Sequence, residues 1–338
     1  MKKVLFATTA LVATAGVAAA DVTFGGYGRF GVMYMDDDST GESSTDVTSR
    51  FRLQIDATAE SDSGVVFGAR VRIQQNNGDS NDAINSINTT TGVVDLNSGP
   101  AGTGINGVRY FARSGGFEVG VGNIFGALET MPGQYPIDLG LTGLGYDYTA
   151  FTGADAYSSG GSGAAGDNGI EVLYSAGDLA IHVSYSDATS YSDANLDGIV
   201  DVGEGADEAN RLAAYVAYTW NGWTFAVGGQ DSDNATDTEW TATAGGSFGI
   251  ADVTLAYADN GTMGDRVVLA ARFDVGAATD MEVYVADNSN GTDADAVNDT
   301  GYGIDFNHDL GGGTSLRGGV AKRFNDDVVA DMGVRFNF

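Results

Sequence analysis

The chain of 338 residues contains no cysteine and only three prolines. The lack of cysteine excludes a disulfide framework and any thiolate chemistry. Proline interrupts the hydrogen-bond ladder of a sheet, so its scarcity leaves room for long strands. Glycine is abundant, with 51 residues, whereas low-complexity disorder usually raises glycine and proline together. The composition therefore favours a folded chain that is stabilised by backbone pairing and burial.

Beyond its first residues the chain has no apolar run long enough for a transmembrane helix. The start itself has the pattern of a secretory signal. Lys2 and Lys3 form a basic region, an apolar stretch follows, and the small residues Ala18 to Ala20 fit a cleavage site. We expect residues 1–20 to be a cleaved signal peptide rather than an uncleaved anchor, and residues 21–338 to form one exported domain.

Positive charge is also scarce, because 16 Lys and Arg face 46 Asp and Glu and the net charge is −30. Removal of Lys2 and Lys3 with the signal peptide would change this value to −32. A nucleic-acid partner is excluded, since the phosphate backbone requires Lys and Arg.

Apolar and polar residues alternate with a period of two along most of the mature chain, which is the pattern of β-strands. The segment Arg50 to Ala59 alternates without exception, and the pattern recurs up to Phe338. A soluble sandwich would bury the apolar faces, whereas a membrane barrel would turn them to lipid. Most of the Lys and Arg residues lie on the polar phase, with Lys322 as an exception near a strand end. Cations at these positions favour the barrel, where they would face a water-filled lumen.

The expected connections alternate between short turns and long loops. The short turns are at 61–64, 114–116, 175–178, 221–222, 248–249, 274–276 and 310–313. The longer loops are at about 36–48, 75–104, 123–168, 187–209, 231–238, 259–264, 287–299 and 324–327. Seven turns and eight loops predict an all-β transmembrane antiparallel barrel of 16 strands, with short turns on one rim and long loops on the other.

Three segments resemble the general porin family of Gram-negative bacteria, especially the porins of purple photosynthetic bacteria. They are Val22 to Arg29 (VTFGGYGR), Gly122 to Glu129 (GNIFGALE) and the terminal Gly333 to Phe338 (GVRFNF). The resemblance covers essentially the whole mature chain. It implies short periplasmic turns, long extracellular loops, a homotrimer, and a C-terminal aromatic residue that is similar to an outer-membrane assembly signal.

The same resemblance implies that the third long loop, about 123–168, folds into the pore opposite a basic wall. Opposed charges would create a transverse field that filters ions. The candidate acids of the loop are Glu129, Asp138, Asp147 and Asp155. The candidate basic residues are Arg29 and Arg52, which fit the family motifs, and Arg50, Arg70, Arg72 and Arg109, which share their strand phase. The alternative is an acidic loop that is simply solvated.

Residues 193–204 match the spacing of a twelve-residue calcium loop, in which Gly198 would make the turn. The ligands would be Asp193, Asn195, Asp197, the carbonyl of Ile199, Asp201 and Glu204. We expect a structural calcium ion here and no required cofactor. The alternative is a chance match, because Asp, Asn and Gly are common in acidic loops.

The predicted function is passive diffusion of ions and small hydrophilic solutes, with a preference for cations, across an outer membrane of lipid and lipopolysaccharide. The main alternative is a substrate-selective channel, but its aromatic track would have only Tyr27, Tyr215 and Tyr284. An enzyme is disfavoured because no nucleophile and base pair is evident, and His182 has no recognisable partner in the sequence. A soluble calcium-binding sandwich is disfavoured by the unequal connections.

Overall fold

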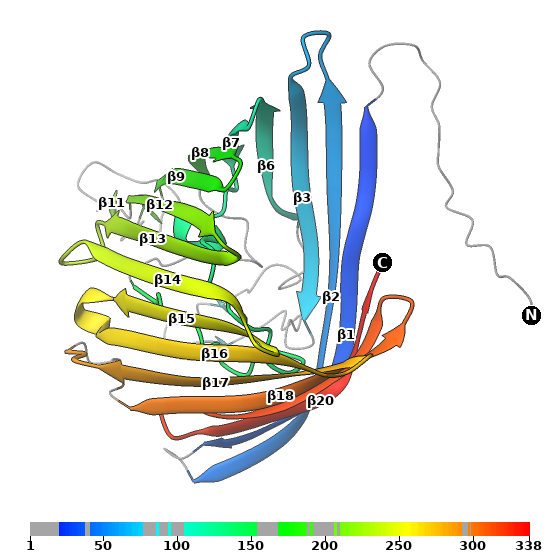
Figure 1. Ribbon diagram of the computed structural model, residues 1–338, viewed down its shortest axis with the longest axis vertical. Coiled ribbons are helices and arrows are strands. Elements are labelled where there is room, and N and C mark those ends of the chain that lie inside the picture. The colour runs from blue at the N-terminus through cyan, green and yellow to red at the C-terminus, as the bar shows by residue number, and fades with distance from the viewer. Residues whose placement is uncertain are drawn as a thin grey trace, which may run out of the picture.

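The computed structural model describes residues 20–37, 41–76, 86–87, 94–95, 105–153, 168–187, 190–191, 206–207, 210–292, 297 and 299–338. Sixteen of its strands form one closed antiparallel barrel, which confirms the predicted fold class (Figure 1). In barrel order they are β1 (Asp21–Asp37), β2 (Glu42–Glu60), β3 (Val66–Asn76), β6 (Ile105–Ser114), β7 (Phe117–Gly122), β8 (Asn168–Ala176), β9 (Leu179–Asp187), β12 (Arg211–Trp220), β13 (Trp223–Ser232), β14 (Glu239–Phe248), β15 (Ala251–Asp259), β16 (Asp265–Gly276), β17 (Thr279–Ser289), β18 (Thr300–Gly311), β19 (Thr314–Lys322) and β20 (Val328–Asn337).

Each barrel strand turns large apolar side chains outward and polar or small side chains inward, as its sequence alternation predicts. In β16, Val267 and Leu269 are exposed on the outer face, whereas Val268 and Ala270 are buried inside the barrel. In β18, the outer Ile304 is exposed and the neighbouring inner Asp305 is buried. An exterior of this kind is stable against lipid and unfavourable against water.

The barrel closes where β1 pairs with β20 in antiparallel register. Gly26 and Phe338 exchange two backbone hydrogen bonds of 2.9 and 3.1 Å, so the last residue continues this ladder. The ring of Phe338 is exposed and stacks on Phe51 of β2, with 5.7 Å between the ring centroids. The C-terminal aromatic residue therefore lies on the outer face of the barrel.

Short turns join alternate strand pairs on one rim, and longer connections join the others. Asn221 and Gly222 alone connect β12 to β13, and both have positive φ, at 49° and 79°. This geometry fits a two-residue hairpin of the type favoured by Asn-Gly, because its twist matches that of the strands. Two-residue strands also occur within the long connections, as β4 (Ser86–Ile87) with β5 (Val94–Asp95) and β10 (Ser190–Tyr191) with β11 (Ala206–Asp207).

The first long loop is much shorter than predicted. The sequence suggested a loop at about 36–48, but β1 and β2 stay paired up to Asp37 and Glu42. The residues at the start of β2 are mostly polar on both faces, so the alternation that marks the other strands is missing there. Backbone pairing with β1 extends this strand without help from an apolar face.

Two short 3-10 helices, η1 (Ala127–Thr130) and η2 (Gly261–Met263), complete the described elements. Among the described residues, no helix is long and apolar enough to cross a membrane.

Candidate functional site: the loop-narrowed lumen

The described part of the third long loop, residues 123–153, lies against the inner wall of the barrel (Figure 1). Its side chains Leu128, Leu139 and Phe151 are fully buried. They pack in one cluster with small inward-facing residues of the wall, which are Ala213, Ala217, Ala226, Ala256, Ala258, Ala270, Ala286 and Ala321. Larger side chains at these positions would fill the space that the loop occupies. Alanine on the inward phase of β12 to β19 was thus a sequence signal for the covered side of the lumen.

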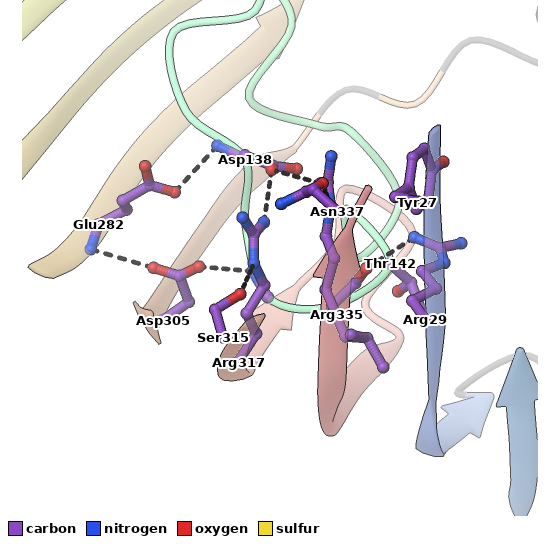
Figure 2. A network of polar contacts seen from close by, with 12 residues as sticks. Tyr27, Arg29, Asp138, Thr142, Glu282, Asp305, Ser315, Arg317, Arg335 and Asn337 are labelled. Atoms are coloured by element: carbon purple, nitrogen blue, oxygen red, sulfur yellow. Dashed lines mark hydrogen bonds and ion pairs between the residues drawn. The ribbon is translucent and has the colours of Figure 1, made fainter. Parts of the chain in front are cut away.

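Three carboxylates of the wall, Glu282, Asp305 and Asp331, hold the loop by its backbone, and we call them the carboxylate latch. Glu282 accepts the N–H of Asp138 (2.9 Å), and Asp305 accepts the N–H of Gly140 (2.6 Å). Figure 2 shows Glu282 and Asp305 beside the segment that carries Asp138. Hydrogen bonds that involve a carboxylate are stronger than those between neutral groups, so the latch fixes this stretch firmly.

The third member of the latch, Asp331 on β20, makes more hydrogen bonds with the loop than Glu282 or Asp305. Its two carboxylate oxygens accept the N–H of Leu141 (2.9 Å), the N–H of Thr142 (2.7 Å) and the hydroxyl of Thr142 (2.7 Å). The sequence does not predict the latch, because an inward-facing acid gives a strand the same polar alternation whether the acid faces water or a folded loop.

Among the described acids of the loop, Asp138 is the most exposed, with 60% of its side chain accessible. One of its oxygens bonds to Arg317 of β19 at 2.5 Å and to Arg335 of β20 at 3.1 Å (Figure 2). Neither arginine belongs to the predicted basic set. The contacts therefore assign two further charged residues to the lumen, from β19 and β20.

Four of the predicted basic residues bond to neutral groups. Arg29 donates to the carbonyl of Leu141 (2.6 Å), which also brings it against the loop. The other three donate to wall amides, as the pairs Arg50 with Asn76 (2.6 Å), Arg52 with Gln74 (2.7 Å) and Arg72 with Gln54 (3.1 Å). Within the described ranges none of the four has a salt bridge to a carboxylate. We call these four residues the arginine wall.

Tyr27 lies near Arg29 on β1 (Figure 2) and contacts further arginines of the basic side. The guanidinium carbon of Arg335 is 4.3 Å from the centre of its ring, and that of Arg52 is 5.5 Å away. Arg50 approaches the Tyr27 hydroxyl at 3.4 Å. The aromatic ring lets cations from two strands, β2 and β20, pack closely, because its face attracts positive charge.

The other two predicted basic residues are neutralised by carboxylates. Arg70 pairs with Asp56 at 2.6 Å, and Arg109 bonds to both Glu118 and Glu171. A guanidinium between two carboxylates contributes little net field to the lumen. Strand phase placed Arg109 on the inner face but could not distinguish it from the arginine wall.

Glu129 lies in η1, and the positive charges of Arg72, Arg211 and Arg52 act on it. Burial raises the pKa of Glu129 from its ordinary value to about 7, although the three arginines pull in the opposite direction. Its Oε2 atom is buried and has no hydrogen-bond partner among the described residues. This carboxyl therefore changes charge near neutral pH, beside the arginine wall.

Asp147 is buried and lies against the connection between β19 and β20. It accepts the N–H of Phe324 at 3.0 Å and is 3.6 Å from Arg323. Burial is the main cause that raises the pKa of Asp147, and Arg323 opposes it. Its carboxylate ties the loop to the long-loop rim and is hidden from the channel.

Two predictions fall outside the described residues. They are the constriction acid Asp155 and the calcium loop with its ligands Asp193, Asn195, Asp197, Ile199, Asp201 and Glu204. Both stay predictions. Across the described ranges, no group of three or more His, Asp or Glu side chains is placed to hold a metal ion.

A closed sixteen-stranded barrel with an apolar exterior and a polar, loop-narrowed interior is the architecture of a transmembrane β-barrel channel. The chain belongs to the Gram-negative porin family, whose sequence pattern matches residues 7–328. Family and fold together make it an outer-membrane porin channel, from a family of channels rather than of enzymes.

Individual relatives agree over almost the whole chain. A porin of Fuscovulum blasticum is 32% identical over 331 residues, which cover 94% of this chain and 100% of that protein. A porin of Rhodobacter capsulatus is 29% identical with the same coverage of both proteins. Among solved structures, a substituted variant of the Rh. blastica porin superposes with a TM-score of 0.73 at 28% identity, over 94% of this chain and all of that chain. The predicted resemblance to the porins of purple bacteria is confirmed.

Proposed function

We propose that the channel passes ions and small hydrophilic solutes by passive diffusion, between loop residues 123–153 and the arginine wall. The observation that supports this most directly is the carboxylate latch, because it holds the loop inside the barrel against the wall formed by β17, β18 and β20. Size exclusion and the field between Glu129, Asp138 and the basic side would then filter solutes. No step of this mechanism requires a cofactor.

We further propose that the channel prefers cations. The net charge of −30 attracts cations to both mouths, and Glu129 supplies negative charge at the loop itself, whereas the charge of Asp138 is balanced by Arg317 and Arg335. The opposite preference is a second candidate, since the arginine wall has no salt bridges within the described residues and would draw anions at the narrow part.

The reversal potential in a potassium chloride gradient across a planar bilayer separates the two candidates. The cation channel is supported if the wild type is more permeable to potassium than to chloride and this permeability ratio falls by roughly twofold or more in Glu129→Gln and Asp138→Asn. A wild-type channel that prefers chloride, with a preference that Arg52→Gln removes, supports the second candidate instead.

A substrate-selective channel is less well supported. The three tyrosines of the predicted aromatic track have separate surroundings. Tyr27 contacts arginines, Tyr215 contacts His182, and Tyr284 is buried beside Tyr148 of the loop. A solute track needs successive exposed rings, so the described lumen favours general diffusion.

Export and assembly complete the proposal. We propose that residues 1–20 are removed as a signal peptide, on the strength of Lys2, Lys3 and the small residues before Asp21. The exposed apolar belt supports contact with outer-membrane lipid and lipopolysaccharide. The homotrimer rests on family membership, and cross-linking in mild detergent would test it.

A further inference from the structure

A buried polar chain links the barrel wall to η1, the helix that carries Glu129. His182 of β9 is 1% exposed and Glu171 of β8 is 2% exposed. The imidazole Nε2 lies 2.9 Å from Glu171, and Nδ1 lies 2.8 Å from the Thr130 hydroxyl. Glu171 also accepts a hydrogen bond from Arg109, which balances its charge in this buried position.

The direction of the bond between His182 and Glu171 follows from the carboxylate of Glu171. An ionised carboxylate only accepts, so Nε2 of His182 carries the proton and donates to Glu171. Nδ1 of His182 and the Thr130 hydroxyl share a hydrogen bond of 2.8 Å, and the same hydroxyl donates to the carbonyl of Ala127 at 3.2 Å. The Tyr215 hydroxyl also bonds to Thr130, and its ring meets His182 edge to face at 5.7 Å. Every polar side chain in this hydrogen-bonded network has a partner, which makes the network rigid.

Other contacts fix the rest of the helix. The N–H of Ala127 donates to the hydroxyl of Ser184, two residues beyond His182 on β9 (2.8 Å). Leu128 fills the space beside Gly228, where an added Cβ would lie 2.5 Å from the leucine side chain. Three of the four residues of η1 are therefore held by the wall, and the remaining one is Glu129.

We propose that His182 and Glu171 are positioning residues that set the location of the Glu129 carboxylate in the channel, and through it the ionic selectivity. The effect on ionic selectivity rests on the proposed function, whereas the positioning of Glu129 does not. The histidine touches no solute and acts through Thr130. Arg109 then serves to pair with Glu171 rather than to attract ions.

Thr130→Val tests the proposal with little risk to folding, because Thr130 is exposed and the change removes only its hydroxyl. We expect the potassium-to-chloride permeability ratio to fall by about twofold or more, and Thr130→Ser to restore it. His182→Phe should have the same effect while it keeps the ring contact with Tyr215. In a Glu129→Gln background, Thr130→Val should have no further effect. The matched control is Thr219→Val, which breaks a hydroxyl bond of 2.9 Å to Thr224 away from the loop.

A second measurement is independent of ion flow. The chain has no cysteine, so Glu129→Cys provides a unique position for a nitroxide label. We expect the label to gain mobility in Thr130→Val and His182→Phe but not in Thr219→Val. Unchanged mobility and unchanged selectivity in both variants would overturn the proposal, as would an equal effect of Thr130→Val with and without Glu129. A wild-type protein that never conducts, together with the mobility difference in the labelled variants, would refute the proposed function and leave the positioning role standing.

Discussion

At the scale of the residue, the lumen separates charges that look equivalent in the sequence. Arg29, Arg50 and Arg109 all lie on the inward phase, but only Arg109 is neutralised by carboxylates. Glu129 and Asp147 are both loop acids, but Asp147 is tied to Arg323 and hidden from the channel. The electrical behaviour of the pore therefore depends on a few residues with unbalanced charge.

Glu129 gives a pH-dependent prediction at this scale. Because its pKa is raised to about 7, the carboxyl is neutral below that pH and negative above it. The permeability ratio of potassium to chloride should therefore rise as the pH increases through about 7, by roughly twofold. Reversal potentials measured across this range would show the step. Glu129→Gln should abolish it, and a step that persists in this variant would assign the titration to another group.

At the scale of the element, the alternation of β-strands predicted the barrel, the sixteen strands and the face of each side chain. It could not predict which charges meet across the lumen. Asp138 bonds to Arg317 and Arg335, which are 179 and 197 residues away in the chain. Such contacts depend on the path of the loop, and a loop without a repeating pattern leaves that path undetermined. The polar start of β2 hid part of a strand for a related reason, because only backbone pairing extends it.

The carboxylate latch gives a prediction for the loop as an element. Asp331→Ala removes the partners of two backbone N–H groups and one hydroxyl, at a cost of about 1–3 kcal/mol for each bond. We expect the barrel to remain folded while the loop detaches locally. Single-channel records should then show frequent current fluctuations, and proteases should cut between residues 138 and 142.

The control for this variant is Asp309→Ala, which removes an acid whose side chain, among the described residues, bonds to the short turn at Gly311 and not to the loop. It should leave the current as quiet as that of the wild type. A quiet, protease-resistant Asp331→Ala channel would show that the remaining latch and the apolar contacts of the loop hold it without Asp331.

At the scale of the whole molecule, a net charge of −30 is compatible with a basic side of the lumen because the acidic and basic residues lie in different parts of the barrel. Strands β19, β20, β1, β2 and β3 carry the arginines of the basic side, whereas the acids Glu282 and Asp305 of β17 and β18 bond to the loop backbone. The closed ladder satisfies the backbone of the barrel without disulfides. The same closure turns the apolar faces outward, so the molecule combines a lipid-facing surface with an aqueous path.

Conductance of the purified full chain in a planar lipid bilayer tests the existence of that path most directly. We predict stable, stepwise increases in current as single channels insert, with conductance proportional to the salt concentration over most of its range. Bilayers that stay sealed after verified insertion of folded protein would contradict an open lumen beside the latched loop.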